Sequence, residues 1–146
     1  MAEPALAIPV CCARVVTSKH PGWLVGLNLF FAALFVLSAG LQYNDPDPMR
    51  WAVMYGAAAV STVLALHTRS GWVAAGAVGL VAAVWGGWLW HEVIGHVLFS
   101  DFWRKMSEKG GKVEVMREAG GLTIVCTWLS VSSLVGWQKS RPARPE

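Results

Sequence analysis

The chain has 146 residues, of which 55% are hydrophobic and only 14% are charged. Soluble domains carry charge on about a quarter of their residues, so this composition excludes an ordinary soluble domain and indicates a membrane protein. The net charge of +3 comes from Lys and Arg outside the apolar runs. No basic cluster resembles a nucleic-acid groove, so the expected partner is the lipid bilayer and not nucleic acid.

Four apolar segments are long enough to cross a membrane, which takes roughly 20 residues. We expect the spans at about 22–43, 48–67, 71–99 and 119–137, within one transmembrane domain over 22–137. All four should be helices, because an isolated segment in lipid satisfies its own backbone only as a helix and the sequence shows no two-residue alternation. The expected fold is an all-α integral membrane bundle of four antiparallel helices.

The connection at Thr68-Arg69-Ser70 is too short for anything but antiparallel neighbours. It places the 44–50 turn and the 91–118 segment at one membrane face and both termini at the other. Lys and Arg are equally numerous on the two sides, which leaves the orientation of this multi-pass chain open. Arg14 and Lys19, in the short flank before the first span, favour cytoplasmic termini.

The remaining segments are expected to lie outside the hydrocarbon. Residues 1–21 and 138–146 read as a disordered arm and tail. Cys11 and Cys12 could be acylated or could be two small residues of that arm. Segment 100–118 is interfacial, and aromatic residues interleaved with charges from Ser100 to Lys109 predict a short helix capped by Ser100. Six Trp near the span ends predict an aromatic belt. They are Trp23, Trp51, Trp72, Trp90, Trp103 and Trp137.

The first polar motif is Asn44-Asp45-Pro46-Asp47-Pro48, between the first two spans. Asp47 before Pro48 predicts a helix cap, because its carboxylate can accept from exposed backbone N–H groups. Asp45 before Pro46 favours an Asx-type turn. A simple turn does not need three polar residues, so Asp45 and Asn44 are also candidates for binding a cation or accepting a proton.

The second motif opens the fourth span, where Glu114, Arg117 and Glu118 fall on one helical turn. An ion pair within the helix would explain them structurally. However, Glu118 lies at the apolar boundary, where an ionisable group is costly unless it has a partner, and such residues are functional candidates. The same face continues through Gly121, Val125, Trp128 and Ser132.

Small and polar stripes in the other spans also predict the bundle interior. They are Asn28, Ala32, Phe35, Ala39 and Gln42 in the first span, Trp51, Tyr55, Ala58 and Thr62 in the second, and Gly76, Gly79, Ala83, Gly86 and Gly87 in the third.

A metal site near the end of the third span is a further hypothesis. Glu92 and His96 are four residues apart and would share a helical face, so each could offer one ligand to a site completed by Asp45 or Glu118. His91 and His96 are five apart, which does not fit a zincin motif. The alternative interpretation is that these histidines have no ligand and lie at the hydrated membrane–water interface. We predict no dedicated cofactor, and a divalent cation stays open.

The two polar motifs resemble the transmembrane protein 220 family. The resemblance rests on Asn44-Asp45-Pro46-Asp47 followed by Trp51 and Tyr55, and on Glu114, Arg117-Glu118 and Gly121-Leu122. It covers about residues 25–130, and His91, Glu92 and His96 are not part of it. It implies a membrane protein of four or slightly more helices in which both motifs occur together, and it implies no particular activity.

These patterns predict a binding site at one membrane face that recognises a lipid headgroup, a cation or a partner protein. The expected binding residues are Asn44, Asp45, Asp47, Glu114, Arg117 and Glu118, with support from Gln42, Trp51 and Tyr55. In this site, Arg117 would pair an anion or Glu118. One alternative is a membrane-embedded hydrolase that uses a carboxylate base or a metal, and another is an assembly factor without a ligand. A membrane-protein partner or a homo-oligomer is compatible with either.

Overall fold

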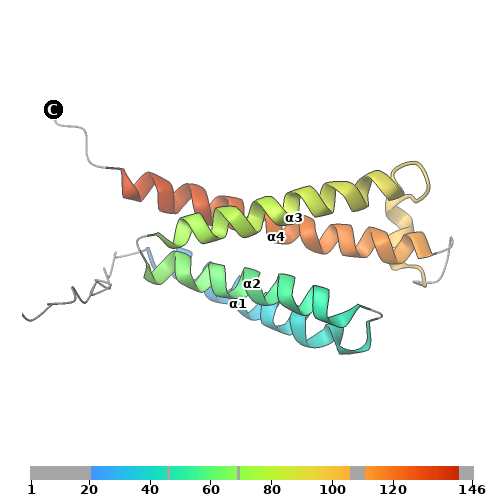
Figure 1. The fold of residues 1–146 in the computed structure, drawn as a ribbon, viewed down its shortest axis with the longest axis horizontal. Helices are drawn as coiled ribbons and strands as arrows, with labels where there is room; N and C mark the ends of the chain where they lie inside the picture. The colour runs from blue at the N-terminus through green and yellow to red at the C-terminus, as the bar shows by residue number, and fades with distance from the viewer. Residues whose placement is uncertain (1–20, 46, 69, 106–110, 142–146) are drawn as a thin grey trace, which may run out of the picture.

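A computed structural model describes residues 21–45, 47–68, 70–105 and 111–141 of the protein (Figure 1). Within these residues the chain forms four α-helices and two short 3₁₀-helices, and no strand. The elements in chain order are α1 (Gly22–Leu41), η1 (Gln42–Asn44), α2 (Pro48–His67), α3 (Gly71–Val93), η2 (Phe99–Trp103) and α4 (Lys112–Ser140). The expected all-α architecture is confirmed.

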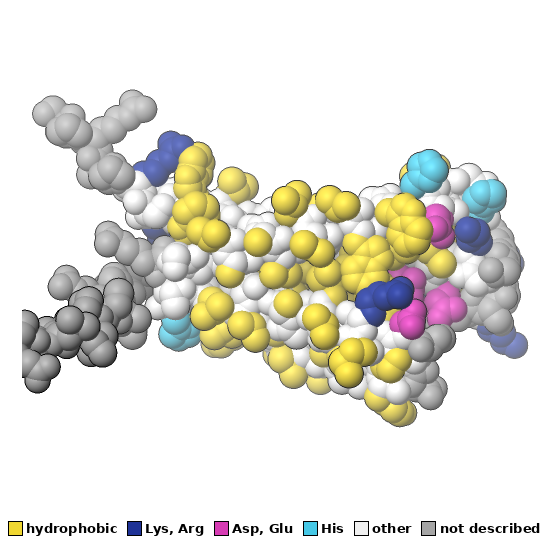
Figure 2. All heavy atoms as spheres, viewed as in Figure 1, with side chains coloured by type: hydrophobic (Ala, Val, Ile, Leu, Met, Phe, Trp, Pro, Cys, Tyr) yellow, Lys and Arg dark blue, Asp and Glu magenta, His cyan; other side chains and the backbone are white. Residues whose placement is uncertain are grey.

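All four α-helices are long and apolar enough to cross a membrane. Large apolar side chains point away from the bundle along their length, for example Leu37 and Leu80, which are both 65% exposed. Figure 2 shows hydrophobic side chains spread along the middle of the visible face, while charged groups gather toward the ends. A water-soluble bundle would bury such side chains, so this surface fits a lipid environment.

The helices run antiparallel in two hairpins (Figure 1). α1 packs against α2, α3 packs most extensively against α4, and α2 also lies against both α3 and α4. The α1–α2 turn and the α3–α4 connection lie at one end of the bundle, and the α2–α3 turn lies at the other. The two polar segments that the sequence places on one face are therefore together.

The bundle interior follows the stripes expected for the first two helices. In α2, Trp51, Tyr55, Ala58 and Thr62 are all buried. In α1, Asn28, Ala32 and Phe35 are buried, whereas Ala39 and Gln42 near the turn are half-buried. Phe31 joins α1 to α4 by stacking on Trp128, with ring centroids 4.1 Å apart.

In α3, three of the expected small residues make a close contact with α4, and at Gly76 an added methyl group would lie 2.9 Å from Oγ of Ser133. A methyl group at Gly79 would lie 3.2 Å from Cβ of Leu129, and one at Gly86 would lie 3.1 Å from Cβ of Leu122. Both positions are buried, whereas Ala83 and Gly87 are exposed, so the stripe expected for this span is only partly correct. The small residues let α3 and α4 approach closely, as is common between helices in membranes.

Two helix boundaries differ from the expected spans. α3 ends at Val93 and not near Phe99, and Gly95 follows it with φ +85°, a conformation that glycine adopts readily. α4 covers 112–140, so residues 112–118 of the expected interfacial segment and 138–140 of the expected tail are helical. Hydropathy locates the hydrocarbon layer, whereas a helix continues beyond it because its backbone hydrogen bonds are internal.

The expected interfacial helix is shorter and capped differently. Its described part is η2, and the carboxylate of Asp101, not Ser100, accepts a hydrogen bond from the backbone N–H of Leu98 at 2.8 Å. Residues 106–110 of this segment lie outside the described residues. So do the arm at 1–20 with Cys11 and Cys12, and the end of the tail at 142–146.

The Trp residues do not all belong to an aromatic belt. Trp23 and Trp103 are 67% and 81% exposed, as a belt requires. Trp51 is only 4% exposed and stacks on Trp85 of α3 with ring centroids 4.7 Å apart. The Trp51 ring packs inside the bundle because it faces α3, whereas Arg50, the residue before it, is exposed.

Candidate functional site

The acidic site lies where the α1–α2 turn meets the first turns of α4. Acidic side chains gather at this end of the bundle, beside a cationic one, in Figure 2. One carboxylate oxygen from each of Asp45, Glu114 and Glu118 lies within 4.8 Å of the other two, and all three residues are half-buried. The structure thus brings together two motifs that are about seventy residues apart in the sequence. We call these three residues the carboxylate cluster.

The α1–α2 turn holds Asp45 in place through its own hydrogen bonds. Its backbone N–H donates to the carbonyl of Gln42 at 3.0 Å, and its Oδ1 accepts from the backbone N–H of Asp47 at 3.0 Å. This is the expected Asx-type turn. Pro48 then starts α2 at its first position, as expected for a residue without an N–H.

Asp47 occupies the N-cap position of α2, but its side chain makes no capping hydrogen bond. Its Oδ2 instead forms an ion pair with Nη1 of Arg50 at 3.3 Å, with both side chains about 60% exposed. The predicted capping role of the carboxylate is therefore wrong, because the carboxylate pairs with the Arg50 side chain one turn later.

Helix α4 supplies the other two carboxylates. Because α4 begins at Lys112, Glu114 and Glu118 are four residues apart on one face of its first two turns. Acids are favoured near a helix N-terminus by the partial positive charge of its free N–H groups. The apolar part of α4 begins at Ala119, so the cluster lies at the level where the helix enters the membrane.

Burial and like charge both disfavour the ionised form of Glu118, and burial is the larger effect. Glu118 interacts unfavourably with the charges of Asp45, Glu114 and Asp47, and favourably with Arg50. Partial burial strengthens each of these interactions, because less water screens them. Arg50 offsets part of this repulsion, and a bound cation or a proton shared between two of the carboxylates would offset more of it.

Tyr55 and Trp51 support the cluster from α2. The hydroxyl of Tyr55 is buried between α2 and α4, at Gly121, and interacts electrostatically with Glu118. The Trp51 ring stacks on both Tyr55 and Trp85. These two aromatic side chains set the distance between α2 and the other hairpin, and so position Asp45 relative to α4.

Arg117 does not pair with Glu118. Its Nε and Nη2 donate to the carbonyl oxygen of Phe102 at 3.0 and 2.9 Å, and Nη2 also donates to the carbonyl of Arg104 at 3.0 Å. Its guanidinium carbon lies 5.8 Å from the centre of the Phe102 ring. Arg117 thus ties η2 to α4.

Two other expected residues lie in the α1–α2 turn. Gln42 is half-buried, and Asn44 is described only as backbone in η1.

Glu92 and His96 do not form the alternative metal site in the described residues. Glu92 lies 3.9 Å from the ammonium group of Lys112, and His96 is exposed in the turn after α3. Since α3 ends at Val93, the two side chains do not share a helical face. The carboxylate cluster is the grouping in the described part of the chain that could hold a metal ion.

Sequence reasoning missed Arg50, Trp85 and Asp101. Arg50 is the cation next to the cluster and lies over the Trp85 ring at 6.0 Å. Asp101 is 2% exposed and pairs with Nε of Arg104 at 3.0 Å. The three-residue spacing of Asp47 and Arg50, and of Asp101 and Arg104, was the signal that could have identified these pairs.

Comparison with known protein families shows to which family this chain belongs. Residues 34–134, more than half of the chain, match the family described as transmembrane family 220, helix. The chain belongs to transmembrane family 220. The matched range contains both polar motifs, so the family resemblance predicted from them is confirmed. No solved structure matches the chain.

Membership of transmembrane family 220 and the four apolar helices agree on the environment of the protein. It is an integral, multi-pass membrane protein whose helices contact the lipid bilayer. The carboxylate cluster of this family member lies at one end of its bundle.

Proposed function

We propose that the protein binds a divalent cation at one membrane face through Asp45, Glu114 and Glu118. The observation that carries this proposal is that one oxygen from each carboxylate lies within 4.8 Å of the others. Oxygen ligands of a single Ca²⁺, each at about 2.3–2.6 Å, are at most about 5 Å apart. All three ligands are oxygens, which favours Ca²⁺, Mg²⁺ or Mn²⁺ over Zn²⁺ or Cu²⁺.

The cation would also link the two hairpins. Asp45 belongs to the turn of the first hairpin, and Glu114 and Glu118 belong to the last helix of the second. Without a bound cation these carboxylates repel one another and Arg50 offsets only part of the repulsion, which weakens the contact between the hairpins at this end. With a bound cation all three carboxylates are attracted to the same ion, which holds the hairpins together. The protein would then hold or present this membrane face in a cation-dependent way, which is a recognition role and not a catalytic one.

The hydrolase alternative has no comparable support. A hydrolase needs a nucleophile or an activated water beside a base and a site for the substrate. Among the described residues next to the cluster, Tyr55 supplies a buried hydroxyl that is wedged against Gly121. Cys126 is half-buried in α4, two helical turns beyond Glu118. Neither arrangement resembles a nucleophile paired with a base.

Calorimetry and thermal unfolding of the full chain in lipid nanodiscs test the proposal. Addition of Ca²⁺, Mg²⁺ or Mn²⁺ should release or absorb heat with one saturable site and should raise the unfolding temperature. A ligand at 100 times its Kd stabilises the folded state by about 2.7 kcal/mol. Glu118→Gln and Glu114→Gln should each abolish the effect.

Glu92→Gln is the matched control. Glu92 lies at the same end of the bundle and pairs with Lys112, but it is outside the cluster. This variant should bind the cation as the wild type does. The proposal fails if none of the three cations binds, or if Glu92→Gln weakens binding as much as Glu118→Gln.

A further inference from the structure

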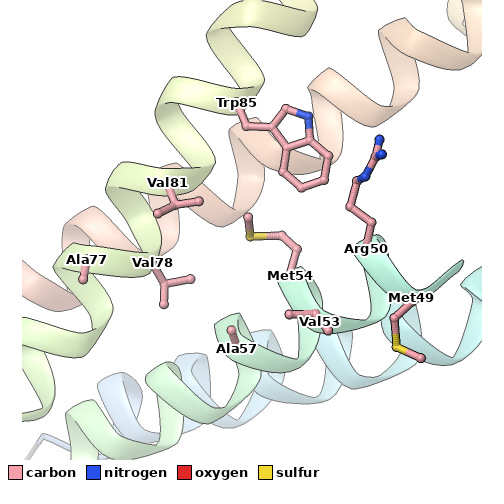
Figure 3. Close-up of a pocket in the computed structure, with 9 residues that line it drawn as sticks. All are labelled: Met49, Arg50, Val53, Met54, Ala57, Ala77, Val78, Val81 and Trp85. Atoms are coloured by element: carbon pink, nitrogen blue, oxygen red, sulfur yellow. The ribbon is translucent and has the colours of Figure 1, made fainter. Parts of the chain in front are cut away.

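A groove of about 550 Å³ runs between α2 and α3 on the outer surface of the bundle. Figure 3 shows Arg50 and Trp85 at one end of it and Ala57 and Ala77 toward the other. The walls are apolar, and Arg50 is the charged member of the described lining residues. The groove exists because the small side chains of Ala57 and Ala77 leave space where two antiparallel helices would otherwise meet.

The depth of the groove in the membrane follows from its position on the helices. Arg50 is the third residue of α2, and Ala57 lies seven residues further along the same helix. At 1.5 Å per residue, the groove descends about 10 Å from Arg50, roughly a third of a hydrocarbon core about 30 Å thick. It therefore starts at the headgroup level and ends among the acyl chains.

An occupant of this groove needs an apolar chain below and a polar group at the level of Arg50. In a bilayer the acyl chains are already in an apolar environment, so contact with the apolar walls does little to select one lipid over another. Selectivity must therefore come from the headgroup. A guanidinium presents donors in a planar fork that matches a phosphate.

The acidic neighbours of Arg50 define the rest of the headgroup. Oδ2 of Asp47 lies 3.3 Å from Nη1 of Arg50, and Glu118, which neighbours Asp45 in the cluster, is close enough to interact with Arg50. These carboxylates repel a headgroup with net negative charge. A zwitterionic headgroup places its phosphate on the guanidinium and its ammonium on Asp47. Carboxylates accept hydrogen bonds, which a primary ammonium donates and a quaternary ammonium does not.

We propose that the groove between α2 and α3 binds one phospholipid with a primary ammonium headgroup, of the phosphatidylethanolamine class. One acyl chain lies along Ala57 and Ala77, the phosphate contacts Arg50 and the ammonium contacts Asp47. A lipid bound in this way does not require a cation on Asp45, Glu114 and Glu118, so the two sites are tested separately.

Native mass spectrometry of the full chain, released from nanodiscs with equal amounts of phosphatidylethanolamine, phosphatidylcholine and phosphatidylglycerol, tests the proposal. The protein should retain one phosphatidylethanolamine in preference to the other two lipids. Arg50→Gln should reduce the retained lipid at least about tenfold, because the phosphate loses a hydrogen bond to a charged group. Asp47→Asn should retain lipid but reduce the preference for phosphatidylethanolamine over both other lipids, because the ammonium loses its carboxylate partner.

Ala77→Leu, which fills the groove, should also lose the lipid. Ala83→Leu is its matched control, because Ala83 is exposed on α3 and is outside the groove lining. If Ala77→Leu does not fold, Arg50→Gln at an exposed side chain still decides the matter. Equal retention of the three lipids, or equal retention by the wild type, Arg50→Gln and Ala77→Leu, would mean an annular lipid only and would overturn the proposal.

Discussion

The hydroxyl of Tyr55 in α2 fills the space that a side chain at Gly121 of α4 would occupy. Gly121 lies three residues after Glu118, so this contact is directly below the carboxylate cluster. It joins the two hairpins at the point where Asp45 meets α4. The absence of a Cβ at position 121 is therefore a requirement for assembling the cluster, and not only for helix packing.

Gly121→Ala should lower the free energy of unfolding by about 1–3 kcal/mol, the usual cost of overpacking. It should also weaken cation binding, because the methyl group displaces Tyr55 and moves α2 away from α4. Gly120→Ala is the neighbouring control, since a Cβ there would make an ordinary 3.6 Å contact with Phe102. Thermal unfolding and cation titration of both variants check this prediction. Equal losses in the two variants would contradict it.

Tyr55→Phe should rescue much of the Gly121→Ala defect. The atom in the way is the hydroxyl oxygen, because the ring carbon that carries it would lie 3.5 Å from the new methyl group. A double-mutant cycle on unfolding free energies should give a coupling energy of about 0.5–3 kcal/mol in the stabilising direction. Additive effects would show that the clash is not with the hydroxyl.

Asp45→Asn should keep the hydrogen bond that holds the α1–α2 turn and remove only the negative charge. The amide oxygen of Asn can accept the same N–H from Asp47, and the repulsion between Asp45 and Glu118 is removed, so the cation-free unfolding free energy should not fall below that of the wild type. Cation binding should be lost, because one of three charged ligands is gone. Asp47→Ala should cost less than about 1 kcal/mol, as expected for an exposed ion pair, and should leave the cation site intact. Cation titration and unfolding of both variants distinguish a cation ligand at Asp45 from an exposed ion pair at Asp47. If Asp47→Ala weakens cation binding as much as Asp45→Asn does, Asp47 is also a cation ligand.

Arg117→Lys should release η2 although it keeps the positive charge. The fork of Arg117 reaches two carbonyl oxygens, and a Lys ammonium does not reproduce that planar geometry. Hydrogen exchange of residues 99–104 should become faster, while cation binding is retained. If Arg117→Lys abolishes cation binding and leaves exchange unchanged, Arg117 belongs to the cluster after all.

The shared membrane face of the two motifs can be tested by labelling. Tyr43 and Phe99 are each 82% exposed at the end of the bundle that carries the cluster, and Thr68 lies at the other end. In a background with Cys11, Cys12 and Cys126 replaced by Ser, single Cys variants at 43 and 99 should react with an impermeant maleimide from one side, and a Cys variant at 68 from the other. Labelling at 43 and 99 from opposite sides would remove the basis for the carboxylate cluster.

The sequence by itself determined the number of spans, their antiparallel order and the convergence of the two polar motifs. Apolar segments of membrane length have to be helices, and an even number of crossings returns the chain to the same face. The boundaries of α2 at Pro48 and His67 were also predictable, because Pro48 starts the helix and polar Thr68 follows its end.

Only the tertiary structure decided what each polar side chain contacts. Asp47 could cap α2 or pair with Arg50, and Arg117 could pair with Glu118 or with carbonyls of η2; local spacing permits each of these. The choice depends on contacts that local spacing does not reveal: Arg50 lies 3.3 Å from Asp47, and the connection between α3 and α4 places the carbonyl of Phe102 within 2.9 Å of Arg117. The end of α3 at Val93 was likewise hidden, because the apolar run continues into η2 while the backbone turns at Gly95.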